Sequence, residues 1–335
     1  MTGFQSEKRL VREYYTALED ARRDTVTGVL DRFLSSDHRW RGYHPFYELS
    51  GIDAVSETFW VPLIQALAPL QRRVDIFFAG DNALDAGGRW VVSMGHLMGL
   101  FDRPWLGIRP TGKLQFLRYA EFMRVENGKI TETAFYIDIP HFMTQAGCDP
   151  FPHQTGTTLV QPGPQTHDGL LFDDADRAEG AKTLARIESM AKNLGTWQSP
   201  LPIEEELRLD WAEDMIWWGP HGIGATYTID RYIKQHAGVF RASFTNRSST
   251  GHVARLAEGH FGGFFGWPNF SAEPTGGFMG MPATGKTAEF RVIDIYRRAG
   301  DKLVENWVFI DLLHLWKQFD VDILGRLTAL QEGPR

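Results

Sequence analysis

The chain has 335 residues, of which 43% are hydrophobic and 23% charged, a composition typical of a globular protein. Its formal net charge of −7 and isoelectric point near 5.9 argue against a nucleic-acid partner, because a phosphate-binding surface needs clustered lysine and arginine. No run of about 18 apolar residues occurs, the amino terminus lacks the apolar core of a signal peptide, and Cys148 is the single cysteine. We therefore expect a cytoplasmic protein without a membrane span, an internal disulfide or a cysteine-based zinc site.

Residues 1–147 are expected to form one domain that begins with helices. Leu10, Tyr14 and Leu18 recur at helical spacing, and a second amphipathic helix follows at 26–34. Asn127-Gly128 is a hairpin signal between the last two strands of this half. The other expected elements are a strand at 38–45, a helix at 52–70, and strands at 74–79, 89–100, 114–125 and 130–137.

Residues 148–169 carry four prolines and no hydrophobic periodicity, so we expect a linker there. A second domain is expected at 170–335. It opens with a helical segment at 170–194 and then repeats the order of the first domain. Its expected strands lie at 255–265, 287–297 and 303–310.

An internal repeat supports this division. Thr111-Gly112-Lys113 recurs as Thr284-Gly285-Lys286, 173 positions later, and the offset holds without a gap for about thirty residues. Further upstream the halves match at shifted offsets. The matching pairs are Trp40-x-Gly42 with Trp217-x-Gly219, Ile52-Asp53 with Ile229-Asp230, and Gly95-His96 with Gly259-His260. The chain therefore contains two copies of one domain of roughly 150 residues.

Helices followed by a curled, mostly antiparallel sheet define the α+β class. We expect two tandem cone-shaped units, each with a bent sheet wrapped by helices around an apolar pocket. The two cones should pair sheet against sheet as an intrachain pseudo-dimer, with further homo-oligomers left open. Alternation along the last strand places Trp307 and Phe309 on one face and Val308 on the other, so the two rings should pack against the first copy.

Two segments carry a family resemblance. Residues 283–314 are similar to the carboxy-terminal sheet of SnoaL-like polyketide cyclases, and residues 217–240 resemble the strand and helix that close their pocket. These cyclases belong to the nuclear-transport-factor-2-like superfamily, as do the ketosteroid isomerases. The resemblance implies a cone-shaped fold and acid–base chemistry on carbonyl compounds without metal or cofactor. The same fold also hosts proteins that only bind ligands.

The chain departs from the family pattern where the cyclases carry His-Trp-Asp. Thr133-Ala134-Phe135 stands there in one copy and Asn306-Trp307-Val308 in the other, so the acid–base Asp of the family is absent from both halves. A histidine that the family directs into the pocket is replaced by Glu121 and Asp294. A relocated carboxylate could perform related chemistry.

Glu121 and Asp294 are the first catalytic candidates, because each carboxylate lies within a strand of large apolar residues. Desolvation there would raise the pKa of the carboxyl group and suit it to act as a general base or acid. The alternative is a wet strand face on which each acid pairs with Arg118 or Arg291.

The other candidates have structural alternatives. Asp138 and Asp311 end matching strands, where a helix cap is the favoured role. His96 and His260, both expected on central strands, could be catalytic or simply buried, and His44 before Pro45 could be a base or a turn residue. Tyr14 could support an oxyanion or belong to the core. The expected substrate-binding residues are Tyr14, Trp40, Tyr119, Trp217, His221 and Tyr296.

Two functions follow from these residues. The first is a cofactor-independent lyase, isomerase or cyclase acting on a small hydrophobic or aromatic carbonyl compound by aldol, retro-aldol or isomerisation chemistry. The second is a non-catalytic protein that binds an apolar ligand in the same cone. No metal-binding spacing and no phosphate-binding glycine loop appears in the sequence, so no cofactor is expected.

Overall fold

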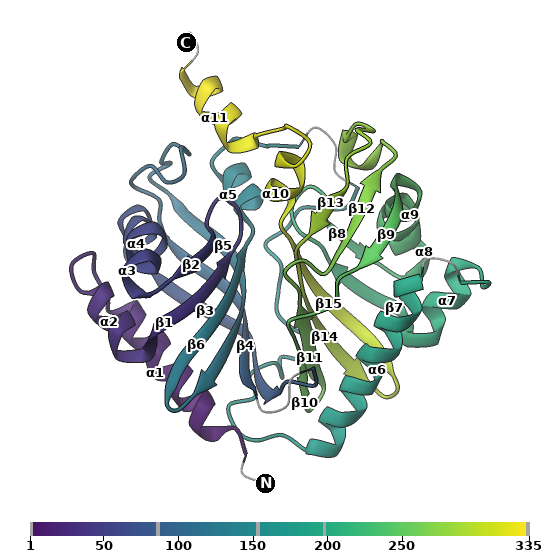
Figure 1. The fold of residues 1–335 in the computed structure, drawn as a ribbon, viewed down its shortest axis with the longest axis horizontal. Coiled ribbons are helices and arrows are strands. Elements are labelled where there is room, and N and C mark those ends of the chain that lie inside the picture. The colour runs from purple at the N-terminus through teal and green to yellow at the C-terminus, as the bar shows by residue number, and fades with distance from the viewer. Residues whose placement is uncertain (1–2, 85–87, 152–154, 197–198, 333–335) are drawn as a thin grey trace.

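The computed structural model describes residues 3–84, 88–151, 155–196 and 199–332. The first half begins with helices and continues into a sheet, as the sequence predicts (Figure 1). Its elements are α1 (Gln5–Glu19), α2 (Val26–Phe33), β1 (Leu34–Gly42), β2 (Tyr47–Ser50), α3 (Ile52–Val55), a π-helical segment (Ser56–Trp60), α4 (Val61–Ala66), β3 (Gln71–Asp81), β4 (Arg89–Leu100), β5 (Leu114–Glu126), β6 (Lys129–Ile137) and α5 (Ile139–Gln145).

The six strands of this half form one sheet in the order β2-β1-β6-β5-β4-β3. Neighbouring strands are antiparallel except β1 and β6, which are parallel. Strands β4 and β5 are buried along most of their length. This sheet is covered by its own helices on one side and by the second half on the other. Strands that are covered on both faces consist of nearly continuous apolar residues, which explains the burial of β4 and β5.

The second half repeats this order with more elements. It contains α6 (Arg177–Thr196), α7 (Ile203–Asp210), β7 (Trp211–Trp218), β8 (Ala225–Tyr227), α8 (Ile229–Tyr232), a π-helical segment (Ile233–Ala237), α9 (Gly238–Ser243), β9 (Phe244–Ser249), β10 (Ala254–Glu258), β11 (Phe261–Phe265), β12 (Phe270–Pro274), β13 (Ala288–Phe290), β14 (Val292–Ala299), β15 (Lys302–Ile310), α10 (Leu312–Lys317) and α11 (Ile323–Glu332). Its main sheet has the order β10-β11-β14-β15-β7-β8, which matches the order in the first half.

Three strands that are continuous in the first sheet are interrupted in the second. The separate small sheet β13-β12-β9 repeats the order of β14-β11-β10, so the counterparts of β5, β4 and β3 are each split in two. The predicted single strand at 255–265 is therefore wrong, because Gly259 adopts a positive φ of 53° and turns the chain into the β10–β11 hairpin. The predicted strand at 287–297 is interrupted at Arg291.

The helix predicted from Leu170 begins only at Arg177. Leu170 instead forms a β-bridge with Phe77 of β3, and the backbone N–H of Phe77 donates to Gly169 at 2.7 Å. Pairing with the edge of the first sheet therefore delays the start of the helix.

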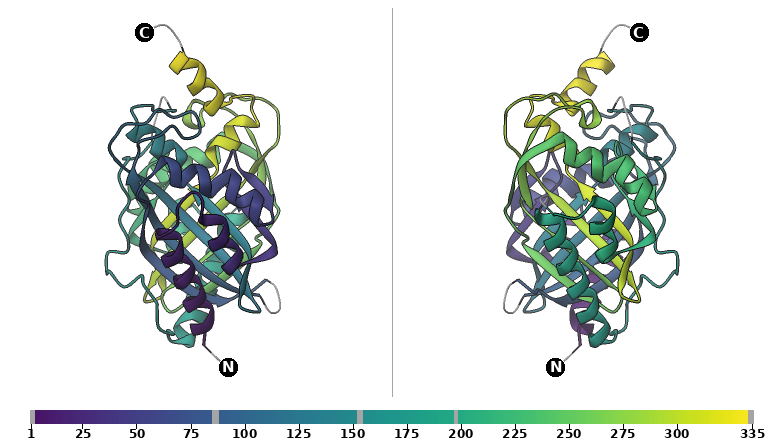
Figure 2. Two further views of the ribbon diagram at one scale, coloured as in Figure 1. Left: turned by 90° about the vertical axis from the view of Figure 1, so that its left-hand side faces the viewer. Right: turned by 90° about the vertical axis from the view of Figure 1, so that its right-hand side faces the viewer.

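The two sheets face each other in the centre of the molecule, and the helices of each half cover the outer side of its own sheet (Figure 1 and Figure 2). Aromatic rings fill the junction. Phe265 of β11 has its ring centroid 5.5 Å from that of Trp90 and 5.3 Å from that of Phe122. The predicted pseudo-dimer of two α+β units, sheet against sheet, is confirmed.

Strand β15 shows which side chains face the junction. Trp307 is fully buried, and its indole N–H donates to the carbonyl oxygen of Pro162 in the connecting segment at 3.0 Å. The guanidinium carbon of Arg118 in the first half lies 3.9 Å from the ring centroid of Phe309. Both rings are therefore buried at the junction, as predicted for this face, and the connecting segment supplies part of the cover over Trp307.

Asp138 and Asp311 join the two halves reciprocally. One oxygen of each accepts a hydrogen bond from the backbone N–H three residues on, in α5 or α10, at 3.0 and 3.1 Å. The second oxygen accepts from the other half, with His221 N 2.9 Å from Asp138 and His44 N 2.8 Å from Asp311. The predicted capping role is confirmed for both residues, and each cap also forms an interdomain bond.

Asp311→Ala should lower the free energy of unfolding by about 2 kcal/mol or more, because it removes a helix cap and leaves a second buried N–H without its acceptor. Urea unfolding at pH 7 measures the change. Asp301→Ala in the exposed β14–β15 turn is the control and should stay within about 0.5 kcal/mol of the wild type. Equal stability of the two variants would contradict the interdomain role.

Candidate functional site

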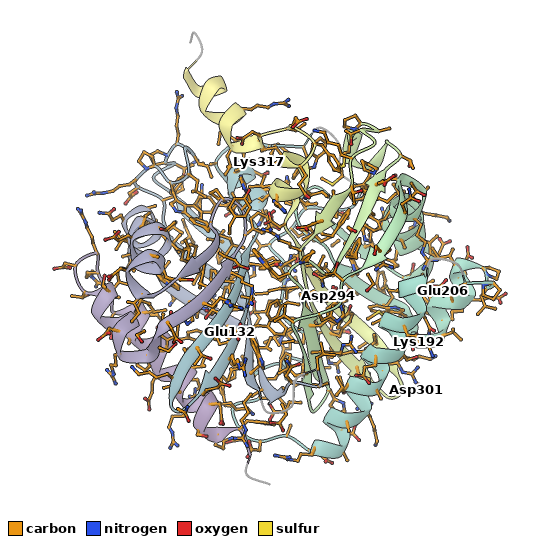
Figure 3. All side chains as sticks on the ribbon, in the orientation of Figure 1. Glu132, Lys192, Glu206, Asp294, Asp301 and Lys317 are labelled. Carbon is orange, nitrogen blue, oxygen red and sulfur yellow. The ribbon has the colours of Figure 1, made fainter. Side chains whose placement is uncertain are left out.

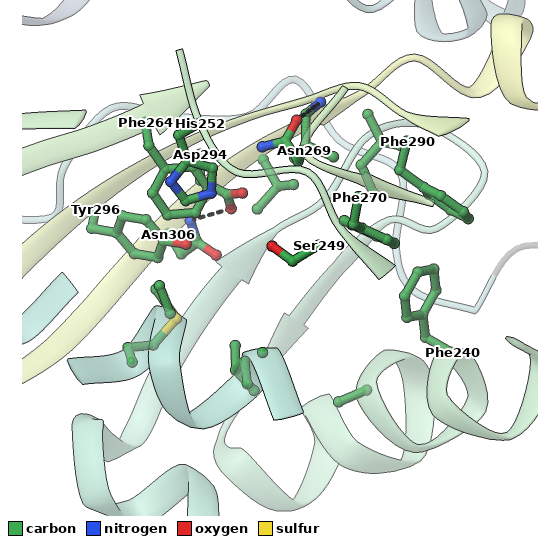
Figure 4. Close-up of a pocket in the computed structure, with 18 of the residues that line it drawn as sticks. Phe240, Ser249, His252, Phe264, Asn269, Phe270, Phe290, Asp294, Tyr296 and Asn306 are labelled. Carbon is green, nitrogen blue, oxygen red and sulfur yellow. Dashed lines mark hydrogen bonds between the residues drawn. The ribbon is translucent and has the colours of Figure 1, made fainter. Parts of the chain in front are cut away.

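A cavity of about 370 Å³ lies inside the second half. It is bounded by the concave face of the main sheet, by α6 and α9, by the π-helical segment Ile233–Ala237 and by the small sheet (Figure 4). Asp294 lies within this half, whereas Asp301 lies at its outer surface (Figure 3). The volume falls in the range of pockets that hold small organic molecules.

Aromatic rings form one wall of the cavity. Phe270 and Phe290 stack with ring centroids 4.5 Å apart and planes 11° from parallel, and Phe240 meets Phe290 edge-on at 5.7 Å. Trp217 stacks on His236 with ring centroids 4.2 Å apart. Flat apolar faces of this kind suit a planar ligand.

Polar groups gather at the other end. The amide nitrogen of Asn306 donates to Oδ1 of Asp294 at 3.2 Å and to the carbonyl oxygen of Ile295 at 3.0 Å (Figure 4). The ring of His252 lies over Phe264 with centroids 3.9 Å apart. The cavity therefore offers a fixed carboxyl group beside an amide, with aromatic surface nearby.

Burial raises the pKa of Asp294 to about 7, while hydrogen bonds from Asn306 and Tyr296 act in the opposite direction. The ion pairs found among the described residues do not include Asp294. Burial lowers the pKa of His252 to about 3, so this imidazole is neutral at pH 7. Asp294 is thus the cavity group that changes charge near neutrality.

The strand register explains why the second cone is hollow. In the first sheet Arg72 of β3 pairs with Leu97 of β4, which pairs with Leu117 of β5. In the second half Ser249 of β9 pairs with Phe270 of β12, which pairs with Phe290 of β13. Leu117 and Phe290 are related by the 173-residue offset, so Ser249 occupies the place of Arg72.

Arg72 fills the interior of the first cone. Its Nη1 lies 2.9 Å from Oε2 of Glu121, and its guanidinium stacks over the rings of Tyr15 at 3.8 Å and Tyr119 at 4.5 Å. The hydroxyl group of Tyr15 donates to Glu121 at 2.8 Å. Burial raises the pKa of Glu121 and the Arg72 cation opposes that rise, so the predicted catalytic carboxylate of this half is an internal ion-pair partner.

The second cone also carries smaller residues at other matched positions. Val292 stands at the offset of Tyr119, and Val308 at the offset of Phe135. Both valines border the cavity, whereas Tyr119 and Phe135 are fully buried and stack with centroids 5.6 Å apart. The sequence predicted equivalent roles for Glu121 and Asp294, and the structure separates them.

The remaining predicted substrate-binding aromatics divide between the two halves. Trp217 and Tyr296 border the cavity. Tyr14, Trp40 and Tyr119 are buried in the core of the closed first cone. Trp40 occupies the position of Trp217, but Phe59 covers its ring at a centroid distance of 5.0 Å.

The histidines predicted to be catalytic, and His221, which was predicted to bind substrate, lie outside the cavity. His44 and His221 lie at the junction, where Nδ1 of His44 is 2.7 Å from the Tyr47 hydroxyl. His96 on β4 has its Nδ1 3.4 Å from Asp75. His260 lies in the exposed β10–β11 turn, so its predicted place on a central strand is wrong. The sequence match between Gly259-His260 and Gly95-His96 therefore aligned a turn of the second half with a strand of the first half.

Sequence reasoning missed His236 and His252, which both border the cavity. His252 lies in the break between β9 and β10, where the first half offers no equivalent. His236 could have been found from the repeat, because it stands 177 positions after Phe59, as Trp217 does after Trp40. The signal for a cavity residue is a polar side chain in one copy at a position where the other copy has an apolar core residue.

Among the residues that the structure describes, no cluster of three or more His, Cys, Asp or Glu side chains is placed to hold a metal ion. The described helices include none that is long and apolar enough to cross a membrane.

Comparison with known protein families gives a match in each half of the chain. Residues 11–133 match the model of the SnoaL-like domain, and residues 268–319 match that of the SnoaL-like polyketide cyclase. Each half thus contains a SnoaL-like sequence, and the chain is a tandem SnoaL-like protein of the nuclear-transport-factor-2-like fold. No curated protein matches the chain.

Solved structures that resemble single domains include three bacterial proteins. A candidate SnoaL-like polyketide cyclase from Jannaschia sp. CCS1 is 17% identical, with 42% of this chain and 91% of that chain covered and a TM-score of 0.32. AclR, a candidate hydroxylase from Streptomyces galilaeus, is 20% identical over 43% and 97%, with a TM-score of 0.35. An NTF2-like protein from Burkholderia xenovorans LB400 is 15% identical over 42% and 96%, with a TM-score of 0.33.

Ser249→Arg should close the cavity. An arginine at the position of Arg72 would place a cation beside Asp294, so the pKa of Asp294 should fall by about 1 to 3 pH units. Carboxyl carbon NMR follows the titration. Calorimetry with 2-naphthol, a planar aromatic probe that we expect the open wild-type cavity to bind, should show that Ser249→Arg does not bind it. Ser248→Arg, on the opposite face of β9 by strand alternation, is the control and should leave both results unchanged. An unaltered Asp294 titration in Ser249→Arg would refute the matched register.

Proposed function

We propose that the second cone is the active site of a cofactor-independent enzyme that moves a proton on a small aromatic or apolar carbonyl compound, with Asp294 as the acid–base residue. The observation that carries this proposal is a half-buried carboxyl group that borders a cavity, has no ion-pair partner among the described residues and has its pKa raised by desolvation to about 7. A group that titrates at the working pH can both accept and return a proton.

The position of Asp294 supports the proposal. Asp294 on β14 pairs directly with Val308 on β15, and Val308 stands where the cyclase pattern has its acid–base Asp. Directly opposed residues of an antiparallel pair carry their Cβ atoms about 5 Å apart on one face of the sheet. The carboxyl group is therefore displaced by one strand while it still faces the same cone.

The proposed chemistry begins with the ionised carboxylate. It removes a proton from the carbon next to the substrate carbonyl, and the protonated form returns this proton to the same or another atom. Asn306 holds Oδ1 of Asp294 and so fixes the orientation of the carboxyl group. Isomerisation and aldol reactions begin with this removal of an α-proton. A retro-aldol reaction begins with removal of the β-hydroxyl proton and ends when the protonated carboxyl group returns a proton to the α-carbon. Phe270 and Phe290 would hold the planar body of the substrate.

A second function, ligand binding without turnover, is favoured by Val308 at the family's catalytic position. The two functions differ in one requirement. Catalysis needs the acid–base capacity of Asp294, whereas binding needs only the shape and the apolar surface of the cavity.

Asp294→Asn should abolish proton transfer. In D2O the wild type should speed the exchange of α-protons in aryl ketones such as 1-tetralone, with a rate that rises to a plateau as pH increases through about 7. The variant should be slower by a factor of about 100 or more, read by proton NMR. Asp301→Asn, the same chemical change at the exposed β14–β15 turn, is the control and should keep the exchange. Binding of the ketones without exchange by the wild type would leave the binding function in place.

The pKa of Asp294 also predicts how stability depends on pH. Because the folded pKa of about 7 lies above the usual 3.8, the folded state holds the proton more tightly and loses stability as pH rises toward 7. Between pH 5 and pH 8 the wild type should lose about 3 kcal/mol relative to Asp294→Asn. Urea unfolding at both pH values measures this difference. If the free energy of unfolding changed equally with pH in the two proteins, the pKa of Asp294 would lie in the ordinary range for an aspartate.

A further inference from the structure

His236 is a buried imidazole at the edge of the cavity whose Nδ1 has no hydrogen-bond partner among the described residues. The residue is 7% exposed and lies within the π-helical segment Ile233–Ala237. Apart from Trp217, its ring neighbours include Tyr232, Phe240 and Phe278, at centroid distances of 5.5, 5.5 and 6.4 Å. An unpaired polar atom in such surroundings costs free energy, and because this Nδ1 has almost no accessible surface, a ligand in the cavity would be bound through the other ring nitrogen, Nε2.

The first half shows what this position looks like when its role is structural. Phe59 precedes His236 by 177 residues, the offset that also relates Trp40 to Trp217, and it lies in the matching π-helical segment Ser56–Trp60. Phe59 is fully buried against Trp40 with ring centroids 5.0 Å apart. The fold therefore accepts an apolar ring here, and packing alone does not require an imidazole.

The charge state of His236 limits the kinds of ligand group that it can bind. Burial lowers its pKa to about 3, so the ring is neutral at pH 7 and has one donor and one acceptor nitrogen. A neutral imidazole that borders a cavity can bind a hydroxyl or carbonyl group of a ligand. It is poorly suited to pair with an anion or to take up a proton near neutrality.

We propose that His236 is a specificity-determining residue that hydrogen-bonds a second polar group of the ligand, distinct from the group that meets Asp294 and Asn306. The inference rests on the proposed function in that both use the same cavity. It assigns the ligand class as planar aromatic compounds with two polar substituents. The ring body of such a ligand would lie along Phe270 and Phe290, and one of its substituents would reach the stacked rings of His236 and Trp217.

The test compares 2-naphthol with a set of dihydroxynaphthalenes of different hydroxyl spacing, by calorimetry on the full chain. At least one diol should bind the wild type about tenfold more tightly than 2-naphthol, the gain expected of one added hydrogen bond. His236→Phe should lose this gain, keep its affinity for 2-naphthol and melt at or above the wild-type temperature. His236→Gln, which keeps a polar group, should retain part of the preference.

Three outcomes would overturn the proposal: no diol binds the wild type more tightly than 2-naphthol, the preference survives in His236→Phe, or His236→Phe melts well below the wild type and so reveals a structural imidazole. Phe59→His is the matched change in the closed cone and should lower the melting temperature without changing the preference. Asp294→Asn separates this inference from the proposed function, because it should abolish proton exchange while the ratio of diol to 2-naphthol affinity stays at its wild-type value.

Discussion

The reciprocal hydrogen bonds of Asp138 and Asp311 set the geometry on which the rest of the molecule depends. Each carboxyl group caps a helix of its own half and accepts from a backbone N–H of the other. Burial raises the pKa of Asp311 to about 7, and its two backbone donors oppose that rise. Because the bonds join the ends of β6 and β15 to the opposite half, the convex faces of the two sheets meet and the concave face of each sheet lies toward its own helices. A pocket in either half must then open away from the junction.

This arrangement lets the two copies diverge without disturbing the contact between them. The first cone is closed by Arg72 and Glu121, a buried pair enclosed by the rings of Tyr15 and Tyr119. A buried ion pair adds little net stability, but losing one partner of it is costly, so the closed cone resists single changes. The second cone has Ser249 in place of the arginine, and Asp294 is left facing a cavity. In the proposed function, one copy thus acts as the scaffold and the other provides the site.

The sequence predicted the architecture well because the repeat is gapless over residues 111–141, which cover the last two strands and the following helix of the first half. It could not separate Glu121 from Asp294, since the difference lies at positions 72 and 249, far away in the chain and brought close only by strand pairing. The suspected partner Arg118 was wrong for a different reason, the alternation of side chains along one strand. Three residues from Glu121, it lies on the opposite face of β5 and donates to the carbonyl oxygens of Val308 and Trp218 at the junction.

The strand breaks of the second half and its hollow interior depend on each other. A continuous strand would carry the sheet across the mouth of the cavity, whereas a break leaves backbone groups without ladder partners. Asn269 resolves this conflict. Its side-chain oxygen accepts from Val292 N at 2.8 Å, its own N–H donates to Phe290 at 2.8 Å, and its carbonyl accepts from Thr250 N at 2.9 Å. One residue thus ties all three breaks together, through its side chain and its backbone, so the small sheet can separate from the main sheet and expose Asp294 to a ligand while the backbone at the rim stays hydrogen-bonded.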